Sequence, residues 1–240
     1  MASDALAPSS KEQIVLTAER LFAEHGIDGI SLRQIGQAAG NANNSAVQYH
    51  FGTKDNLIQA IFEYRLPYLT RRRELLVAER RPASLRSWLE CYLMPSLEQA
   101  EQPDSWYLTF VTQLYRRDRG RLLDRIPPSA RALTEEFHDR VRGFLDIPEP
   151  IRSNRMAQGL TMFMHACADR EAERAYGNPL LPYAAHMRDL LDGLAGLSGD
   201  WPGGLTRLTA TMGGYPRAFE PDDLGHRHLF APGPWPALKA

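Results

Sequence analysis

Cysteine and long apolar runs are both scarce in this 240-residue chain. Its two cysteines, Cys91 and Cys167, are each flanked by apolar or small residues at helical spacing, which argues against a disulfide framework and a cysteine-based zinc site. No stretch approaches the roughly 20 uncharged residues of a membrane span, and residues 1–10 contain no basic segment leading into an apolar run. We therefore expect a soluble, cytoplasmic protein that does not associate with membranes.

The chain also lacks an excess of charge of either sign and the common catalytic motifs. Its formal net charge of −1 gives no overall attraction to a polyanion. A glycine-rich phosphate loop, a nucleophile elbow and a His-Glu-x-x-His metal motif are all absent from the sequence. The sequence therefore predicts no enzyme, no cofactor and no metal site, and it disfavours a protein that binds nucleic acid through charge alone.

Helical periodicity is what the chain has in abundance. Between Ser10 and Leu197 apolar residues recur at helical spacing, and no valine- or isoleucine-rich alternating run indicates a strand. The sequence therefore predicts an all-α fold. The first helix follows a cap at Ser9 and Ser10 and ends at Gly26. Its apolar face carries Ile14, Ala18, Leu21 and Phe22.

Two short helices and a long one follow. Ser31 caps a short helix that stops at Gly40, and a polar turn over residues 41–44 leads into a second short helix ending at Phe51. Thr53 caps the long helix, in which Pro67 should produce a kink. We expect the buried side of this long helix to carry Leu57, Ile58, Ile61, Phe62 and Tyr64.

Beyond Pro82 the pattern predicts five further helices packed as a bundle. Their periodic segments span residues 85–93, 106–114, 133–144, 156–167 and 183–194. From residue 199 glycine and proline crowd together, a composition that disfavours regular helix. We accordingly expect three parts: a three-helix unit over 1–53, a helical bundle over 54–198, and an irregular tail over 199–240.

Residues 14–57 resemble the TetR family of transcriptional regulators. The matching features are an apolar first helix ending in glycine, a serine cap, an apolar helix ending in Ala39 and Gly40, a recognition helix closing in Tyr49-His50-Phe51, and Lys54 with Leu57 after it. Three positions depart from the family pattern: Gly36 replaces the usual alanine, Asn41 the usual valine, and Gln48 a frequent aromatic residue. The turn also looks one residue longer than is usual.

The resemblance implies that residues 1–53 form a helix-turn-helix DNA-binding domain and residues 54–198 a helical effector-binding and dimerisation domain. It also implies that the second short helix enters a DNA major groove. Asparagine, glutamine and serine side chains can bond to base edges, and hydroxyl, basic and imidazole groups can bond to phosphates. The candidate base-reading residues are Asn43, Asn44, Ser45 and Gln48, and the candidate positioning residues are Ser31, Arg33, Gln34, Tyr49, His50 and Lys54.

The amino-terminal domain contains more acidic than basic side chains. Up to Leu57, Asp4, Glu12, Glu19, Glu24, Asp28 and Asp55 outnumber Lys11, Arg20, Arg33 and Lys54. We therefore expect few charge contacts per subunit and a dependence on dimerisation. The resemblance implies a homodimer formed through the last two helices, around 160–168 and 183–194, which binds a palindromic double-stranded DNA operator.

The resemblance also implies a small, apolar effector held inside the larger domain, although plain core packing would explain the same aromatic and thioether residues. Effector binding would move the long helix that begins at Lys54 and so release the DNA, repression being the family's usual behaviour. The candidate pocket residues are Trp88, Tyr92, Trp106, Phe110, Gln113, Phe137, Gln158, Phe163 and His165.

Other interpretations remain open. A helical small-molecule-binding scaffold, or an enzyme, could keep the motif without binding DNA. The enzyme would have to use His165, Cys167, Asp169 and Glu171, whose spacing prevents them from converging on one metal. His226 and His228 are a weak pair in the tail, and the basic runs at 71–73 and 116–121 are best interpreted as solvated helix faces.

Overall fold

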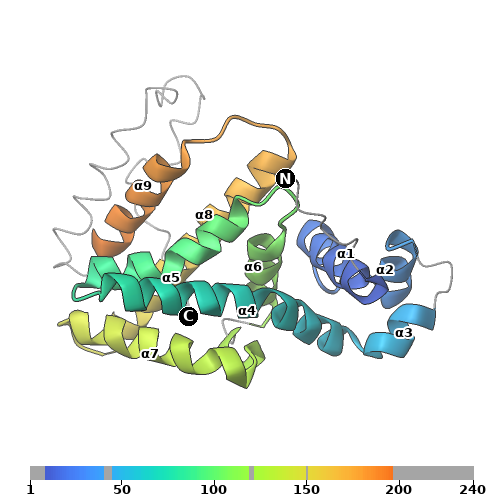
Figure 1. The fold of residues 1–240 in the computed structure, drawn as a ribbon, viewed down its shortest axis with the longest axis horizontal. Helices are drawn as coiled ribbons and strands as arrows, with labels where there is room; N and C mark the ends of the chain where they lie inside the picture. Colours follow the sequence, from blue (N-terminus) through green and yellow to red (C-terminus); the bar gives the residue numbers. More distant parts are fainter. Residues whose placement is uncertain (1–8, 41–44, 119–121, 150, 197–240) are drawn as a thin grey trace, which may run out of the picture.

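The computed structural model describes residues 9–40, 45–118, 122–149 and 151–196, and within these ranges the chain forms helices and no strands. The all-α prediction is therefore confirmed. Three helices gather at one end of the molecule, and a long helix runs from them into a bundle made by the others (Figure 1). The helices are α1 (Ser10–His25), α2 (Leu32–Ala38), α3 (Ser45–Phe51), α4 (Lys54–Arg80), α5 (Leu85–Ala100), α6 (Tyr107–Arg117), the short 3-10 helix η1 (Leu122–Arg125), α7 (Pro128–Phe144), α8 (Ile151–Ala175) and α9 (Tyr183–Gly196).

Local capping defines the ends of α1. The Ser9 side chain accepts a hydrogen bond from the Glu12 backbone, and the Glu12 carboxylate accepts one from the Ser9 backbone, which together satisfy two donors left free at a helix start. Gly26 ends the helix with a φ of 74°, a left-handed value that glycine adopts without steric cost. The apolar face predicted for this helix is buried, with Ile14 and Phe22 fully enclosed.

The helix pair α2 and α3 is closely packed. Ser31 and Gln34 form a second reciprocal capping box at the start of α2. A Cβ atom built on Gly36 would lie 3.0 Å from Val47 Cγ2, so the missing methyl group is what lets α3 approach α2. This close approach gives a physical reason for glycine at a position where the family pattern has alanine.

Helix α4 continues through Pro67 without interruption and links the two parts of the molecule. Its start is fixed by Thr53, whose hydroxyl accepts a hydrogen bond from the Asn56 backbone, as predicted. Leu57, Ile61 and the other apolar residues expected on its inner face are buried. The expectation for Tyr64 was wrong, because this residue lies at the edge of the buried face and is 41% exposed.

The five helices predicted beyond Pro82 are confirmed as α5 to α9. They bury a continuous core in which the Tyr92 and Phe137 rings stack with centroids 3.7 Å apart, joining α5 to α7. Cys91 and Cys167 are both buried and are not bonded to each other. Within the described ranges, no helix is both long enough and apolar enough to span a bilayer. The predicted tail over 199–240 lies outside the described residues.

Candidate nucleic-acid interface and ligand cavity

Helix α3 presents one face to the protein and the opposite face to solvent. Val47 and Phe51, four residues apart, are buried against the neighbouring helices. Gln48, Tyr49 and His50 are exposed, and the Tyr49 ring is 85% accessible. Burying an aromatic side chain lowers the free energy by kilocalories per mole. A tyrosine that is exposed on a short, well-anchored helix is therefore available to contact a partner surface.

The other candidate DNA-binding residues differ in how freely they are presented. Arg33 is exposed on α2. The side chains of Ser31 and Gln34 are exposed but bonded to each other, with 2.6 Å between Oγ and Oε1. Lys54 is half-buried and its Nζ donates to the Ile27 carbonyl at 2.9 Å, so one of its three protons already holds the loop between α1 and α2.

Three candidates cannot be placed in full. Asn43 and Asn44 lie outside the described residues, and of Ser45 only the backbone, at the start of α3, is described. The ends of the turn are nevertheless fixed by Gly40, which has a φ of 72°, and by the buried Val47. These three residues therefore remain predictions from the sequence.

The acidic residues of the amino-terminal domain do not oppose DNA where α2 and α3 are presented. Residues 31–54 contain no aspartate or glutamate, whereas they contain Arg33 and Lys54. Three of the acidic side chains counted from the sequence are paired with arginines of the larger part of the chain: Glu19 with Arg65, Asp28 with Arg117, and Asp55 with Arg125. The domain's acidic balance thus serves contacts inside the chain.

The two basic runs are not simply solvated faces. Arg73 is buried, Arg72 pairs with Glu98 of α5, and only Arg71 of that run is exposed. In the second run, Arg117 pairs with Asp28, while residues 119–121 lie outside the described residues. The interpretation as solvated faces was wrong for Arg73, because it lies four residues after Leu69 and three before Leu76, on the same buried face of α4.

The start of α6 is held by carboxylates from two other helices. Trp106, its N-cap residue, supplies no side-chain cap. The Glu171 carboxylate of α8 accepts hydrogen bonds from the Leu108 and Thr109 backbone amides and from the Ser105 and Thr109 hydroxyls. Negative charge is favourable at a helix amino terminus, where backbone donors are unsatisfied. Glu171 of α8 therefore caps the amino terminus of a different helix, α6.

Glu19 makes the second connection, from α1. Its carboxylate is 1% exposed and accepts two hydrogen bonds of 2.7 Å from Arg65 on α4, and a third from the Trp106 backbone. Burial acts to lower the pKa of Arg65, but the hydrogen bonds and charge of Glu19 outweigh it and the pKa is raised. This ion pair ties the amino-terminal domain to α4 and to the start of α6.

The burial of Glu171 predicts a specific pH dependence of stability. Burial raises the pKa of Glu171 above its usual value of 4.5, although its four hydrogen bonds act in the opposite direction. The folded state then binds more protons than the unfolded state, so stability falls as the pH rises from about 4.5 through the raised pKa. The variant Glu171→Gln has no carboxyl group to ionise at this position, so it should not lose stability in this way as the pH rises.

Urea unfolding of both proteins between pH 4 and pH 8 measures the difference. We expect the free energy of unfolding of the wild type to fall relative to that of Glu171→Gln as the pH increases above about 4.5. If the wild type instead gains stability relative to the variant over this interval, the hydrogen bonds lower the pKa of Glu171 by more than burial raises it.

The middle of α6 packs between α1 and α4. The Phe110 ring is fully buried, with its centroid 6.1 Å from Phe22 of α1 and 5.9 Å from Phe62 of α4. At the carboxyl end of α6, Arg117 reaches Asp28 in the loop between α1 and α2. Helix α6 thus contacts the amino-terminal domain at its beginning, middle and end.

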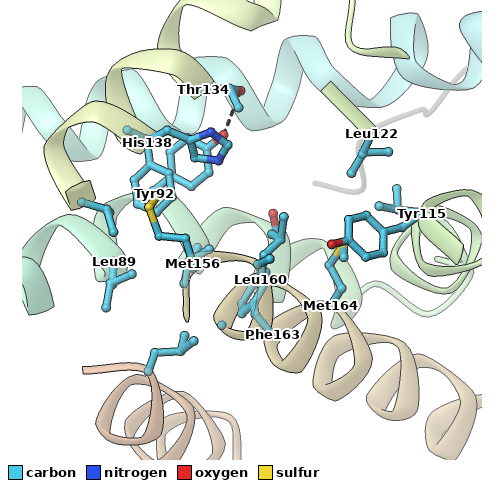
Figure 2. Close-up of a pocket in the computed structure, with 18 of the residues that line it drawn as sticks. Leu89, Tyr92, Tyr115, Leu122, Thr134, His138, Met156, Leu160, Phe163 and Met164 are labelled. Atoms are coloured by element: carbon cyan, nitrogen blue, oxygen red, sulfur yellow. Dashed lines mark hydrogen bonds between the residues drawn. The ribbon is translucent and has the colours of Figure 1, made fainter. Parts of the chain in front are cut away.

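A cavity of about 360 Å³ lies inside the bundle, among α4 to α9. Its wall is mainly aliphatic, aromatic and thioether, and Figure 2 shows Tyr92 and Tyr115 on opposite sides of Leu160 and Phe163. The Tyr92 hydroxyl donates to Thr134 at 2.8 Å. The volume falls within the roughly 300–1,000 Å³ typical of small-molecule sites.

Three of the predicted pocket residues, Tyr92, Phe137 and Phe163, line this cavity. The other six lie elsewhere. Trp88 packs under Arg140, Phe110 lies between α1 and α4, and Trp106 borders a separate polar crevice beside α1. Gln113 and His165 are half-buried away from the wall, and Gln158 is exposed. Arg73, Tyr115 and His138 also line the cavity but were not predicted from the sequence. Only their positions in the helical repeat could have indicated that they face inward.

The four residues that an enzyme would have used do not come together. Glu171 is engaged at the start of α6, Cys167 is buried and Asp169 is exposed. The His165 Nδ1 lies 2.9 Å from the Thr161 carbonyl oxygen. Among the described residues, no group of three or more histidine, cysteine, aspartate or glutamate side chains is arranged to bind a metal. His226 and His228 lie outside those residues.

A capped helix, α2, followed after residues 41–44 by a second helix with one buried and one exposed face, is typical of a helix-turn-helix DNA-binding domain. Residues 14–61 match the family described as "Bacterial regulatory proteins, tetR family". This match confirms, for residues 14–61, the resemblance to the TetR family found in the sequence.

Two curated relatives match a short part of the chain. The HTH-type transcriptional repressor AcnR of Corynebacterium glutamicum is 40% identical over 53 residues, which are 22% of this chain and 28% of the relative. The AcnR of Corynebacterium efficiens is 38% identical over the same length. The chain thus matches less than a third of the length of these relatives.

Two solved structures resemble the chain over most of its length. A putative TetR-family transcriptional regulator from a Rhodococcus species has a TM-score of 0.47 at 15% identity, covering 80% of this chain and 100% of the other. The TetR family regulator PfmR from Thermus thermophilus has a TM-score of 0.35 at 18% identity, covering 83% of this chain and 94% of the other.

Proposed function

We propose that the chain is a homodimeric, sequence-specific repressor that binds a palindromic DNA operator and leaves it when a small molecule occupies the bundle cavity. The observation that carries the proposal is the exposed face of α3, where Gln48, Tyr49 and His50 project from a helix anchored by Val47 and Phe51. The match of residues 14–61 to the TetR family supports it, as does the name "repressor" of the AcnR relatives.

Base reading in the proposal falls to Asn43, Asn44, Ser45 and Gln48. Amide side chains present a donor and an acceptor together, which suits adenine in the major groove. Ser31, Arg33, Gln34, Tyr49, His50 and Lys54 position the domain on the backbone. The absence of acidic residues from 31–54 supports this assignment, because phosphate repulsion is avoided over the whole contact segment.

The switch in the proposal works through α4 and α6 together. Both helices line the cavity, α4 through Phe62 and Leu69 and α6 through Val111 and Tyr115. Both also contact α1, through the Glu19–Arg65 ion pair and the Phe22–Phe110 stack. A ligand that displaces either helix therefore displaces the domain that carries α3. Two recognition helices must match half-sites about 34–36 Å apart, so a shift in their separation weakens DNA binding.

Selection of random DNA duplexes by the purified protein, followed by sequencing, tests the DNA-binding part. We expect enrichment of a palindrome with half-sites about one helical turn apart. Failure of a folded protein to enrich any motif would contradict sequence-specific binding and favour a small-molecule-binding scaffold or an enzyme. Operator titration with a cavity ligand then tests the switch, for which a coupling of about 1–3 kcal/mol predicts a roughly 5- to 150-fold loss of affinity.

A further inference from the structure

The wall of the bundle cavity contains one buried charged side chain, Arg73 of α4. Its neighbours in the wall include Tyr92 and Ser96 of α5 and otherwise mainly apolar side chains. A guanidinium remains protonated in proteins, so this position brings a permanent positive charge to an apolar interior. Burying a charge is costly unless it is paired, which makes the partners of Arg73 informative.

The partners of Arg73 are all neutral. Its Nε donates to the Tyr92 carbonyl oxygen at 2.9 Å, and one Nη2 proton goes to Ser96 Oγ at 3.0 Å. The guanidinium also lies 4.2 Å from the centroid of the Tyr92 ring. These bonds use two of its five N–H donors. Among the described residues no carboxylate lies within ion-pair distance of it, in contrast to Arg72 and Arg65, which each have a glutamate.

The rest of the cavity wall has the same sign of charge. The other ionisable basic side chains in the wall are His138, Arg142 and Arg155, and the wall contains no aspartate or glutamate. Burial lowers the pKa of His138, which favours the neutral imidazole, able to donate one hydrogen bond and to accept another. Arg142 is exposed and pairs with Glu149, so it marks the solvent side of the cavity beside Ser153, whereas Arg73 is enclosed. The wall therefore offers no anionic group to pair with a cationic ligand.

We infer that the cavity binds an amphipathic monocarboxylate, whose carboxylate bonds to the Arg73 guanidinium and whose hydrocarbon part lies against Leu89, Phe163 and Met164. A carboxylate suits the free donors, because guanidinium and carboxylate match in geometry and form charge-assisted hydrogen bonds. The apolar wall supplies affinity in proportion to the hydrocarbon buried. This ligand class deepens the proposed function and differs from the small apolar effector predicted from the sequence by its charged carboxylate; it rests on the proposed function only for its effect on DNA.

Calorimetric titration of the full chain without DNA tests the ligand class. Three probes with the same hydrocarbon tail are compared at pH 7: decanoate, 1-decanol and decylammonium. Hydrogen bonds to a charged group predict that decanoate binds about ten- to a hundredfold more tightly than decanol. Decylammonium should bind more weakly than either. Decanol binding as tightly as decanoate, or no binding of decanoate, would overturn the inference.

Arg73→Gln and Arg71→Gln provide the matched pair of variants, because both residues lie on α4 and only Arg73 faces the cavity. Arg73→Gln should bind decanoate and decanol equally, and its retained affinity for decanol shows that the cavity is intact. Arg71→Gln should keep the full preference. A preference unchanged in Arg73→Gln would overturn the inference, and if that variant does not fold, the probe series on the wild type decides.

Operator titration in the presence of decanoate separates the two proposals. Decanoate that binds and weakens operator binding supports both. Decanoate that binds tightly and leaves operator binding unchanged supports the ligand class and contradicts the switch in the proposed function.

Discussion

Replacing Tyr49 by alanine is expected to weaken operator binding by about two orders of magnitude or more without affecting the fold. A hydrogen bond to a charged phosphate is worth roughly 1.5–3 kcal/mol, and a dimer loses two of them. The ring is 85% exposed, so its removal takes away little packing. Fluorescence anisotropy with a selected operator measures the affinity, and thermal unfolding measures the stability.

The matched control for this experiment is Tyr176→Ala. The Tyr176 ring is 78% exposed and follows α8, in a different part of the chain from α3. We expect the control to bind the operator like the wild type and to unfold at the same temperature. Unchanged operator affinity in Tyr49→Ala would remove α3 from the DNA interface and leave the helical scaffold as the better interpretation. Lys54→Ala is less decisive, because Lys54 also holds the Ile27 carbonyl.

Glu19→Ala is expected to reduce the free energy of unfolding by about 3–5 kcal/mol, the usual cost of removing one partner of a buried ion pair. Arg65, whose side chain is 14% exposed, would lose both hydrogen bonds to its carboxylate, and the Trp106 backbone amide would lose its acceptor. Native domains have a total stability of about 5–15 kcal/mol, so this variant should be close to unfolding at physiological temperature. Urea unfolding followed by circular dichroism measures the loss.

Glu24→Ala on the same helix is the control, because Glu24 forms an exposed pair with Arg20 four residues away. Exposed pairs of this kind contribute about 0.3–0.5 kcal/mol, so its effect should be small. The double variant Glu19→Met, Arg65→Met should recover much of the lost stability, since apolar residues of similar volume leave no charge unpaired. Equal and small losses in Glu19→Ala and Glu24→Ala would contradict the structural role of Glu19.

Ser9, Ser31 and Thr53 show how much of the fold could be predicted from local sequence. Each caps the helix that follows it by bonding to a residue three positions ahead. Such bonds depend on neighbours in the sequence, so the cap pattern is sufficient to find them. The buried faces of α1 and α4 followed in the same way from helical spacing, with Tyr64 at the edge of the stripe as the error.

Phe110 and Phe163 show where local sequence is not enough. Both are buried aromatic residues at helical spacing, and both were expected in the pocket. Phe163 lines the cavity, whereas Phe110 fills the contact between α1 and α4. Periodicity indicates that a side chain is buried but not which helix it is buried against. The sequence could therefore predict an apolar pocket, but it could not show which of the buried residues line it.

The sequence by itself determined the helical fold, the capped starts of α1, α2 and α4 and the presence of a TetR-type helix-turn-helix, because all three depend on residues close together in the chain. Only the tertiary structure decided that Glu19 reaches Arg65, that Glu171 caps α6 and that Arg73 faces the cavity without a carboxylate. The first two contacts join residues 46 and at least 62 positions apart. Their partners are set by how helices pack against one another, which no single helix specifies.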